Sequence, residues 1–337
     1  MHNTFFLVDW LRLAVRGIYE LVSRTSLQEG YAVFVAIVIA TVALKGLTLF
    51  SDINMRKYSV KMQVLQPKID KLKEKYGNDP RRMQEEQRKL MKDNGTSMMA
   101  GCWPMLLMLP IFFMFVAAFR TWSNERMLHL MLTLSQDTDT GVKLFESYRF
   151  LWIHNIWQPD NFIKISCFGQ SVLPVPTAEE FFAKFSALKP GLDKLKLNPE
   201  YVALLQNLHF FEPDTMTVVA DQTLFKEAYD NLMAPCMALW NGQANGYAIL
   251  PLIAGGTSML QSWLSQKAQP KPAEGQQQGM GKMMVYGMPL MFSLFCLGYE
   301  AAFAIYFIIS NIIALIVTLT LNAVFKKQQT NQLEVVK

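Results

Sequence analysis

Residues 30–50, GYAVFVAIVIATVALKGLTLF, form an apolar run that contains one charged side chain, Lys45. A helix of about 20 apolar residues is long enough to cross the hydrocarbon core of a bilayer. A lysine within such a helix costs roughly 2.5–3.5 kcal/mol on insertion scales, so by default it faces protein or water and marks a functional path. This stretch predicts a membrane protein organised around whatever Lys45 faces.

Two interpretations of Lys45 remain open at this point. The lysine stem is long enough to snorkel toward the membrane surface, which would make the charge incidental. Against this, Leu47 and Leu49 continue the apolar run beyond it, and Thr41 and Thr48 lie about one helical turn away. The resulting polar stripe on an apolar helix favours a polar cavity.

Composition supports the membrane class. The chain of 337 residues is 51% hydrophobic and only 18% charged, which is typical of neither a disordered nor an ordinary soluble protein. The apolar residues are clustered, and besides 30–50 they predict spans at 101–122, 246–264, 283–298 and 301–325. We therefore expect an all-α membrane protein with five transmembrane helices.

The lysines and arginines of the short loops predict the orientation. They concentrate between spans one and two, in the loop 265–282 and in the tail 326–337, and this bias marks the cytoplasmic side. The N-terminus and the segment 123–245 are then outside and the C-terminus is cytoplasmic. Residues 1–28 carry charges on one face and predict an amphipathic helix in the outer interface, with an uncleaved ordinary anchor as the alternative.

Residues 52–97 predict a cytoplasmic helical hairpin. Met62, Leu65 and Ile69 follow the spacing of an amphipathic helix, and the sequence Gly77-Asn78-Asp79-Pro80 supplies a turn, an N-cap and a first-turn proline for a second helix. A solvated positive-inside loop explains the charge but not the ordered pair of helices. Such a basic hairpin suits anionic lipid or a nucleic-acid-rich partner such as a ribosome. The basic residues expected to act in recruitment are Lys61, Lys68, Lys71, Arg81, Arg82 and Arg88.

The hairpin sequence KMQVLQPKIDKLKEKYGNDPRRMQEEQRKLMKDNG and the following GCWPMLLMLPIFFMF resemble the bacterial YidC, mitochondrial Oxa and chloroplast Alb insertases. The resemblance resumes at LWIHNI (151–156), YAILPLIAGGTSMLQ, GKMMVYGMPLMFSLF and AIYFIISNIIALI, so it reaches all five spans. Without a large folded domain before the first span, the chain looks like the Gram-positive form of the family.

The resemblance implies a monomeric insertase whose five helices enclose a hydrophilic groove, open to the cytoplasm and to lipid. Lys45 stands where the family usually has a groove arginine, and Thr41 matches a family threonine. Lysine keeps the charge but loses the bidentate fork of arginine. Met108 stands where many members carry a groove glutamine, which predicts a less polar groove.

Polar residues of the other spans are further candidates for contact with a substrate in the groove. For each, a hydrogen bond that merely holds two helices together is the competing role. The candidates are Ser310, Asn311, Thr257, Gln261 and Ser293.

The outer segment departs most from the family pattern. Residues 159–244 look like a helical insertion, in which the capping box Thr177-Ala178-Glu179-Glu180 opens one helix and Asn198-Pro199-Glu200 opens another. Cys167 and Cys236 form either a disulfide or two free thiols. Glu300, in the tight turn between spans four and five, is either an interfacial acid or, more specifically, a cap or the partner of a base from the outer segment.

Catalysis finds no support in the sequence. The histidines lack metal-ligand spacing, and hydrolase motifs and a phosphate-binding loop are absent, so we expect no enzyme activity, no metal, no cofactor and no nucleotide hydrolysis. The predicted function is insertion of nascent membrane proteins into the bilayer of the bacterial plasma membrane. A transporter or channel and a non-inserting scaffold are the alternatives. The Sec translocon and the translating ribosome are expected partners. Sequence-specific binding of nucleic acid is not expected.

Overall fold

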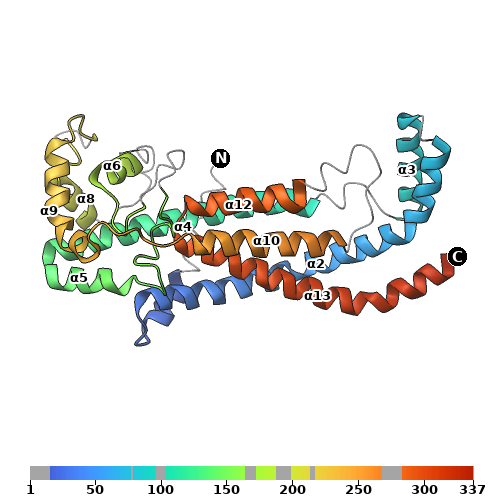
Figure 1. Cartoon of the computed structure of the whole chain (residues 1–337), viewed down its shortest axis with the longest axis horizontal. Helices are drawn as coiled ribbons and strands as arrows, with labels where there is room; N and C mark the ends of the chain where they lie inside the picture. The colour runs from blue at the N-terminus through green and yellow to red at the C-terminus, as the bar shows by residue number, and fades with distance from the viewer. Residues whose placement is uncertain are drawn as a thin grey trace. The chain divides into compact units, whose positions relative to one another are not determined.

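The computed structural model describes residues 16–76, 79–95, 103–163, 172–186, 199–212, 217–267 and 283–336. Within these ranges the protein is helical, and the only β structure is two isolated bridges, Phe150 with Ile153 and Phe211 with Val218. The all-α class predicted from the sequence is confirmed for this part of the chain. Figure 1 shows α2 (Glu29–Tyr76), α3 (Pro80–Asp93), α4 (Trp103–Gln136), α5 (Thr138–Ser147), α6 (Ala178–Ser186), α8 (Pro199–Asn207), α9 (Thr223–Trp240), α10 (Ile249–Lys267), a π-helical turn Met283–Gly287, α12 (Met288–Leu297) and α13 (Ala301–Val336).

A helix lies over each of the five ranges predicted to span a membrane. Within the described residues, two helices are long and apolar enough to cross a bilayer by length and composition, Glu29–Gly46 and Ala301–Phe325, and Val285–Leu297 is a shorter apolar helix. The fivefold crossing therefore stays a prediction. Of the expected interfacial helix 1–28, residues 16–23 are helical, and residues 1–15 lie outside the described residues.

Three helices run past the boundaries predicted for them. The first span and the first arm of the hairpin form one helix, α2, because no glycine or proline interrupts the chain between Gly46 and Pro67. The helix of the second span continues to Gln136, and that of the fifth span continues to Val336. The loop boundaries expected near residues 51, 123 and 326 are thus absent from the backbone.

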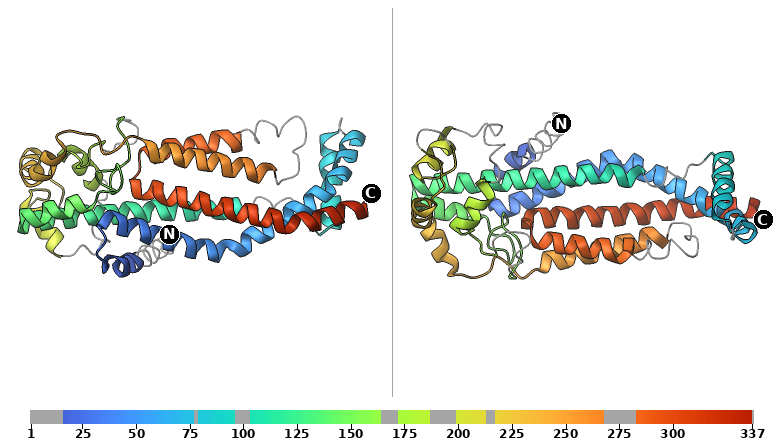
Figure 2. Two further views of the ribbon diagram at one scale, coloured as in Figure 1. Left: turned by 60° about the horizontal axis from the view of Figure 1, so that its bottom comes forward. Right: turned by 90° about the horizontal axis from the view of Figure 1, so that it is seen from above.

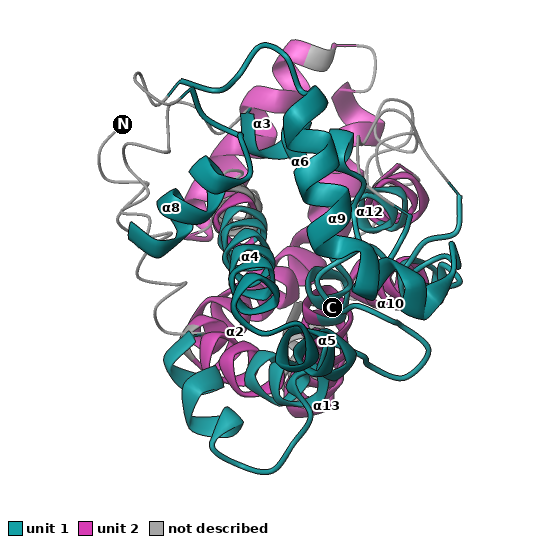
Figure 3. Ribbon diagram, turned by 90° about the vertical axis from the view of Figure 1, so that its left-hand side faces the viewer, with its two compact units in different colours: residues 1–37, 116–252, 293–305 teal, residues 38–115, 253–292, 306–337 magenta. Residues whose placement is uncertain are grey.

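The chain divides into two compact units, shown in teal and magenta in Figure 3. Unit 1 comprises residues 1–37, 116–252 and 293–305, and unit 2 comprises residues 38–115, 253–292 and 306–337. In unit 1 the helices α5, α6, α8 and α9 gather at one end, as the views of Figures 1 and 2 agree. The core between α6, α9 and the segment that follows α8 is aromatic, with the rings of Phe181, Phe210, Phe225 and Tyr229 all buried.

Unit 2 contains the hairpin predicted from residues 52–97. Its two arms meet in a small buried core formed by Met62, Leu65 and Ile69 of α2 and Met91 of α3. Asp79 is the N-cap of α3, accepts a hydrogen bond from the backbone N–H of Arg82 and is followed by Pro80, so the predicted helix start is confirmed.

Candidate functional site

Lys45 lies in α2, in unit 2, with its side chain half-buried. Thr41, one turn earlier on the same face, is only 1% exposed. The hydroxyl of Thr48 donates to the backbone carbonyl of Lys45 at 3.2 Å, so that hydroxyl is satisfied within its own helix. The predicted polar stripe is therefore shielded at Thr41 and half-buried at Lys45 and Thr48, and Lys45 brings a cation to it.

Two of the other candidates, Asn311 of α13 and Thr257 of α10, are brought together. Nδ2 of Asn311 lies 3.3 Å from Oγ1 of Thr257 and 3.5 Å from the carbonyl oxygen of Ala254. The Thr257 hydroxyl itself donates to the carbonyl of Ile253 at 2.8 Å. The hydrogen bonds of this pair join α10 to α13, as expected for residues that hold a bundle together.

Ser293 makes a similar contact within unit 1. Its hydroxyl donates to the carbonyl of Pro251 at 2.8 Å and joins α12 to α10. Gln261 reaches Ser265 on its own helix at 3.4 Å, and Ser310 is within hydrogen-bonding reach of Tyr306 one turn earlier. The side chain of Met108 lies outside the described residues. The role of these polar side chains toward a substrate stays a prediction.

The basic residues of the hairpin that were expected to act in recruitment lie on its solvent-exposed surface. All six that were expected to act in recruitment are exposed: Lys61, Lys68, Lys71, Arg81, Arg82 and Arg88. Arg81 makes only a long ion pair with Glu85, at 3.9 Å, and Arg82 lies over the ring of Tyr76. The hairpin thus presents accessible positive charge on a folded helical pair.

Sequence reasoning missed a polar centre in unit 1, built around Asp160. The Asp160 carboxylate is fully buried and accepts hydrogen bonds from the backbone N–H groups of Tyr247 (2.8 Å), Ala248 (3.1 Å) and Leu250 (2.7 Å). These groups open α10, and the first N–H groups of a helix have no partner within it. A negative charge there also complements the helix dipole. Asp160 therefore caps α10 from a distant segment.

Buried asparagines fix the loop that carries Asp160. The backbone N–H of Asn155 donates to Oδ1 of Asn245 at 2.7 Å, and Nδ2 of Asn245 donates to the carbonyls of Asn155 and Pro159, both at 2.9 Å. Asn245 is fully buried, so each of these bonds satisfies a group shielded from water.

The same loop caps α13 and contacts the end of α12. The backbone N–H groups of Ala301 and Ala302 donate to the carbonyls of Gln158 (2.9 Å) and Ile156 (3.0 Å), and Nδ2 of Asn161 donates to the carbonyl of Leu297 at 3.2 Å. Residues 151–161 thus hold the ends of three helices in unit 1. LWIHNI carried part of the family resemblance, but nothing in its spacing indicated this role.

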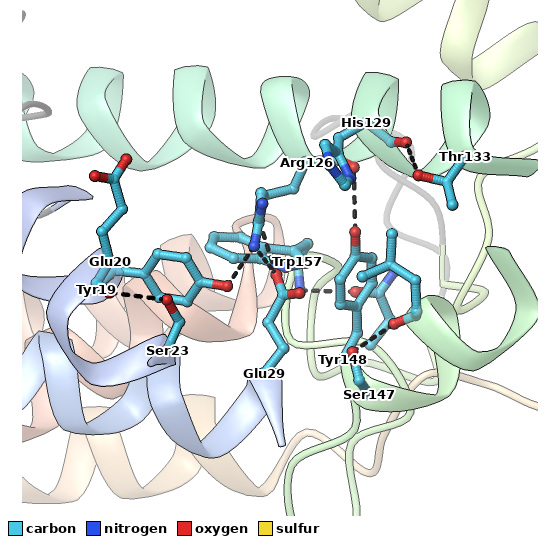
Figure 4. A network of polar contacts seen from close by, with 12 residues as sticks. Tyr19, Glu20, Ser23, Glu29, Arg126, His129, Thr133, Ser147, Tyr148 and Trp157 are labelled. Atoms are coloured by element: carbon cyan, nitrogen blue, oxygen red, sulfur yellow. Dashed lines mark hydrogen bonds and ion pairs between the residues drawn. The ribbon is translucent and has the colours of Figure 1, made fainter. Parts of the chain in front are cut away.

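A second polar network joins the start of α2 to α4. Figure 4 shows the Arg126 guanidinium between Tyr19 and Glu29, with Nε 2.7 Å from Oε1 of Glu29 and a hydrogen bond to the Tyr19 hydroxyl. The side chains of Arg126 and Glu29 are 17% and 9% exposed, so the pair is largely removed from water. The hydroxyl of Tyr148 donates to the carbonyl of Arg126 at 3.3 Å and extends the network to the end of α5.

Glu300 is the partner of a base from the outer segment, the sharper of the two roles left open by the sequence. Its carboxylate is 1% exposed, and Oε1 lies 3.6 Å from Nζ of Lys184 in α6. Burial lowers the pKa of Lys184, and the charge of Glu300 opposes that shift. The predicted capping box of α6 is also formed, with Thr177 N–H donating to Glu180 Oε2 at 3.0 Å and Glu180 N–H to Thr177 Oγ1 at 3.3 Å.

The described histidines and cysteines do not form a metal site, since no group of three or more His, Cys, Asp or Glu residues is placed to hold a metal ion there. Burial lowers the pKa of His129, and the charge of Arg126 lowers it further. Cys236 is a buried free thiol whose pKa burial raises to about 12, whereas Cys167 lies outside the described residues.

The sequence of the chain matches one protein family and relatives that share a single name. The model of a family described as "60Kd inner membrane protein" matches residues 26–329. Three relatives carry the name "Membrane protein insertase YidC". The protein of Clostridium perfringens is 29% identical over 147 residues, which is 44% of this chain and 52% of the relative. That of Clostridium tetani is 27% identical over 143 residues (42% and 56%), and that of Oceanobacillus iheyensis is 34% identical over 126 residues (35% and 46%). The chain therefore spans about half the length of the curated relatives it matches.

Proposed function

Because the chain belongs to the 60Kd inner membrane protein family, we propose that it is an insertase that moves substrate helices from the cytoplasm into the lipid bilayer. The observation that carries the proposal is the half-buried Lys45 beside the buried Thr41 on an otherwise apolar helix. The names of the relatives point the same way. The proposal includes five spans around a hydrophilic groove, in the plasma membrane, with the N-terminus outside.

The barrier to insertion lies in the outer tail of the substrate. Such a tail must cross about 30 Å of hydrocarbon, where each stranded charge or amide costs free energy. A hydrated groove shortens the dry distance, and Lys45 attracts an acidic tail in a medium of reduced dielectric. The apolar helix then enters lipid because burial contributes about 0.8 kcal/mol per methylene. The scheme uses no nucleotide.

The exposed basic hairpin supports a recruiting role. Its arms are held by the core around Met62 and Met91, so the lysines and arginines are displayed on a defined surface. Such a surface suits the phosphate-rich exterior of a translating ribosome, without sequence-specific readout of nucleic acid. Nascent membrane proteins are the substrates, the chain acts as a monomer, and larger substrates involve the Sec translocon.

A non-inserting scaffold is the competing function, and one observation favours it. Asn311 and Ser293 make the helix-to-helix hydrogen bonds expected of residues that only hold a bundle. A scaffold would tolerate loss of the Lys45 charge, whereas an insertase of the proposed kind would not.

The test is insertion of a single-span protein with a short acidic outer tail in cells depleted of their own insertase. The cells carry the unchanged chain or Lys45→Arg, Lys45→Gln or Lys45→Leu at equal abundance. We expect the unchanged chain and the arginine variant to restore insertion and the neutral variants to fail. Lys57→Gln, which removes an exposed lysine of the same helix, is the matched control and should insert normally. Full insertion by Lys45→Leu would contradict the role of the charge.

A further inference from the structure

A polar stripe runs along α2 well beyond the predicted groove. Polar residues recur at intervals of four, three, four, four and three, which places them on one face of the helix over about 27 Å. They are Thr41, Lys45, Thr48, Asp52, Arg56 and Ser59.

Every member of this stripe is shielded. Thr41 and Ser59 are buried, and the other four side chains are half-buried. As far as Phe50 the exposed positions are glycine or apolar, with Val42 54% and Phe50 74% exposed, whereas beyond it the polar Asn54 and Lys57 are exposed. Up to Phe50 this inverts the pattern of a water-soluble helix, because the polar face is shielded and the apolar face is exposed. Charges on the inward face act on one another with less screening than charges on a wet surface.

The charges alternate along the stripe. Asp52 lies two turns, about 10 Å of helical rise, after Lys45 and one turn before Arg56. Asp52 and Lys45 carry opposite charges on the same half-buried face of the helix, so each attracts the other through the Coulomb interaction. Asp52 attracts Lys45, the cation that in the proposed function attracts the acidic tail of the substrate. Asp52 and the substrate tail therefore compete for Lys45.

We propose that Asp52 is a positioning residue, a built-in counter-ion that sets how strongly Lys45 attracts an acidic segment of the substrate and so sets the charge selectivity of insertion. The proposal rests on the proposed function. Loss of the Asp52 charge removes a negative charge from beside the two cations of the stripe, Lys45 and Arg56. Attraction of acidic tails then rises and repulsion of basic tails rises with it.

The first experiment measures insertion of two test proteins that differ only in a short acidic or a short basic outer tail. Asp52→Asn should raise the ratio of acidic-tail to basic-tail insertion rates by about threefold to tenfold. Asp52→Glu should keep the ratio of the unchanged chain. Asp70→Asn, which neutralises an acid of the same helix that is 53% exposed and paired with Lys73, is the matched control and should leave the ratio unchanged.

A double-mutant comparison separates an action through Lys45 from a general effect of charge. In a Lys45→Gln background, Asp52→Asn should change the ratio of insertion rates less than it does in the unchanged chain, because Arg56 is then the only cation left on the stripe. An equal effect in both backgrounds, or no effect of Asp52→Asn in the unchanged background, would overturn the proposal. If the unchanged chain inserts neither test protein, the proposed function itself fails.

The second experiment does not depend on insertion. It therefore tests the role of Asp52 even if the chain inserts neither test protein. Thr48→Cys places a thiol between Lys45 and Asp52, in a full-length chain whose four native cysteines are replaced by alanine. The rates of its modification by a cationic and an anionic methanethiosulfonate reagent report the local potential. Asp52→Asn should lower the cationic-to-anionic rate ratio by about threefold or more, and Asp70→Asn should not change it. An unchanged ratio with Asp52→Asn, or a thiol that reacts with neither reagent, would overturn the proposal.

Discussion

Oδ2 of Asp160 lies 2.7 Å from the backbone nitrogen of Leu250, across 90 residues of sequence. The other carboxylate oxygen accepts from the N–H groups of Tyr247 and Ala248, so one buried side chain satisfies the opening of α10. Gly246 permits this approach, because a Cβ there would stand 2.0 Å from Oδ1 of Asp160. The start of a proposed span is thus fixed by a side chain from a distant loop.

Asp160→Ala should destabilise the protein by about 3 kcal/mol or more, because it leaves buried N–H groups without an acceptor. Gly246→Ala should also destabilise it, since the new methyl group collides with Asp160. Gly256→Ala is the matched control, because a Cβ at that position of α10 meets nothing within 4 Å. Unfolding midpoints in detergent measure all three, and a neutral Gly246→Ala would contradict the packing.

The ion pair of Arg126 and Glu29 should behave as a buried one. Glu29→Gln should cost about 3–5 kcal/mol, because it leaves the Arg126 charge without its carboxylate. Arg16→Gln breaks a pair whose arginine is 45% exposed and should cost no more than about 1 kcal/mol. The same unfolding assay compares them, and equal losses would show that the Arg126 network is open to water.

The contact of Lys184 with Glu300 should hold α6 on the turn before α13. Lys184→Met leaves a buried carboxylate without a cation and should speed hydrogen exchange in α6 by about tenfold or more. Lys226→Met, which removes an exposed cation paired with Glu179, should leave that exchange nearly unchanged. Exchange rates measured on the full-length variants decide between a docked and a loosely attached helix.

His129 should make stability depend on pH. Burial and Arg126 hold its pKa below the usual value of about 6.5, so between that folded-state value and pH 6.5 the unfolded chain binds more protons. The stabilisation is therefore fully present above pH 6.5 and declines as the pH falls. His129→Gln should flatten this slope of the unfolding midpoint, and an unchanged slope would assign the pH dependence to other groups.

Local sequence signals predicted local structure well. Asp79 with Pro80 and Thr177 with Glu180 start helices as their residue types indicate, because both signals act within one turn of the chain. The spacing of Met62, Leu65 and Ile69 likewise predicted the buried face of the hairpin. The family resemblance, which spread over all five predicted spans, is confirmed by the match at residues 26–329.

Long-range polar contacts escaped prediction. Asp160 and Asn245 are single polar residues in irregular segments, without a period or a motif that names a partner 85 or more residues away. For Glu300 the sequence offered a partner from the outer segment as one role but did not identify Lys184, because that pairing depends on how α6 packs. The stripe on α2 was read no further than Thr48, because the helix was expected to end near residue 50. The groove and its contacts with a substrate stay predictions.

The central claim is that this chain itself moves a helix into lipid and that the charge of Lys45 takes part. The most direct measurement reconstitutes the purified chain in lipid vesicles without nucleotide, adds a single-span protein with an acidic outer tail, and scores the protease-protected fraction. The account predicts protection above that of empty vesicles for the unchanged chain and Lys45→Arg, with a loss for Lys45→Leu. Equal protection in empty vesicles and in vesicles with the unchanged chain would contradict it.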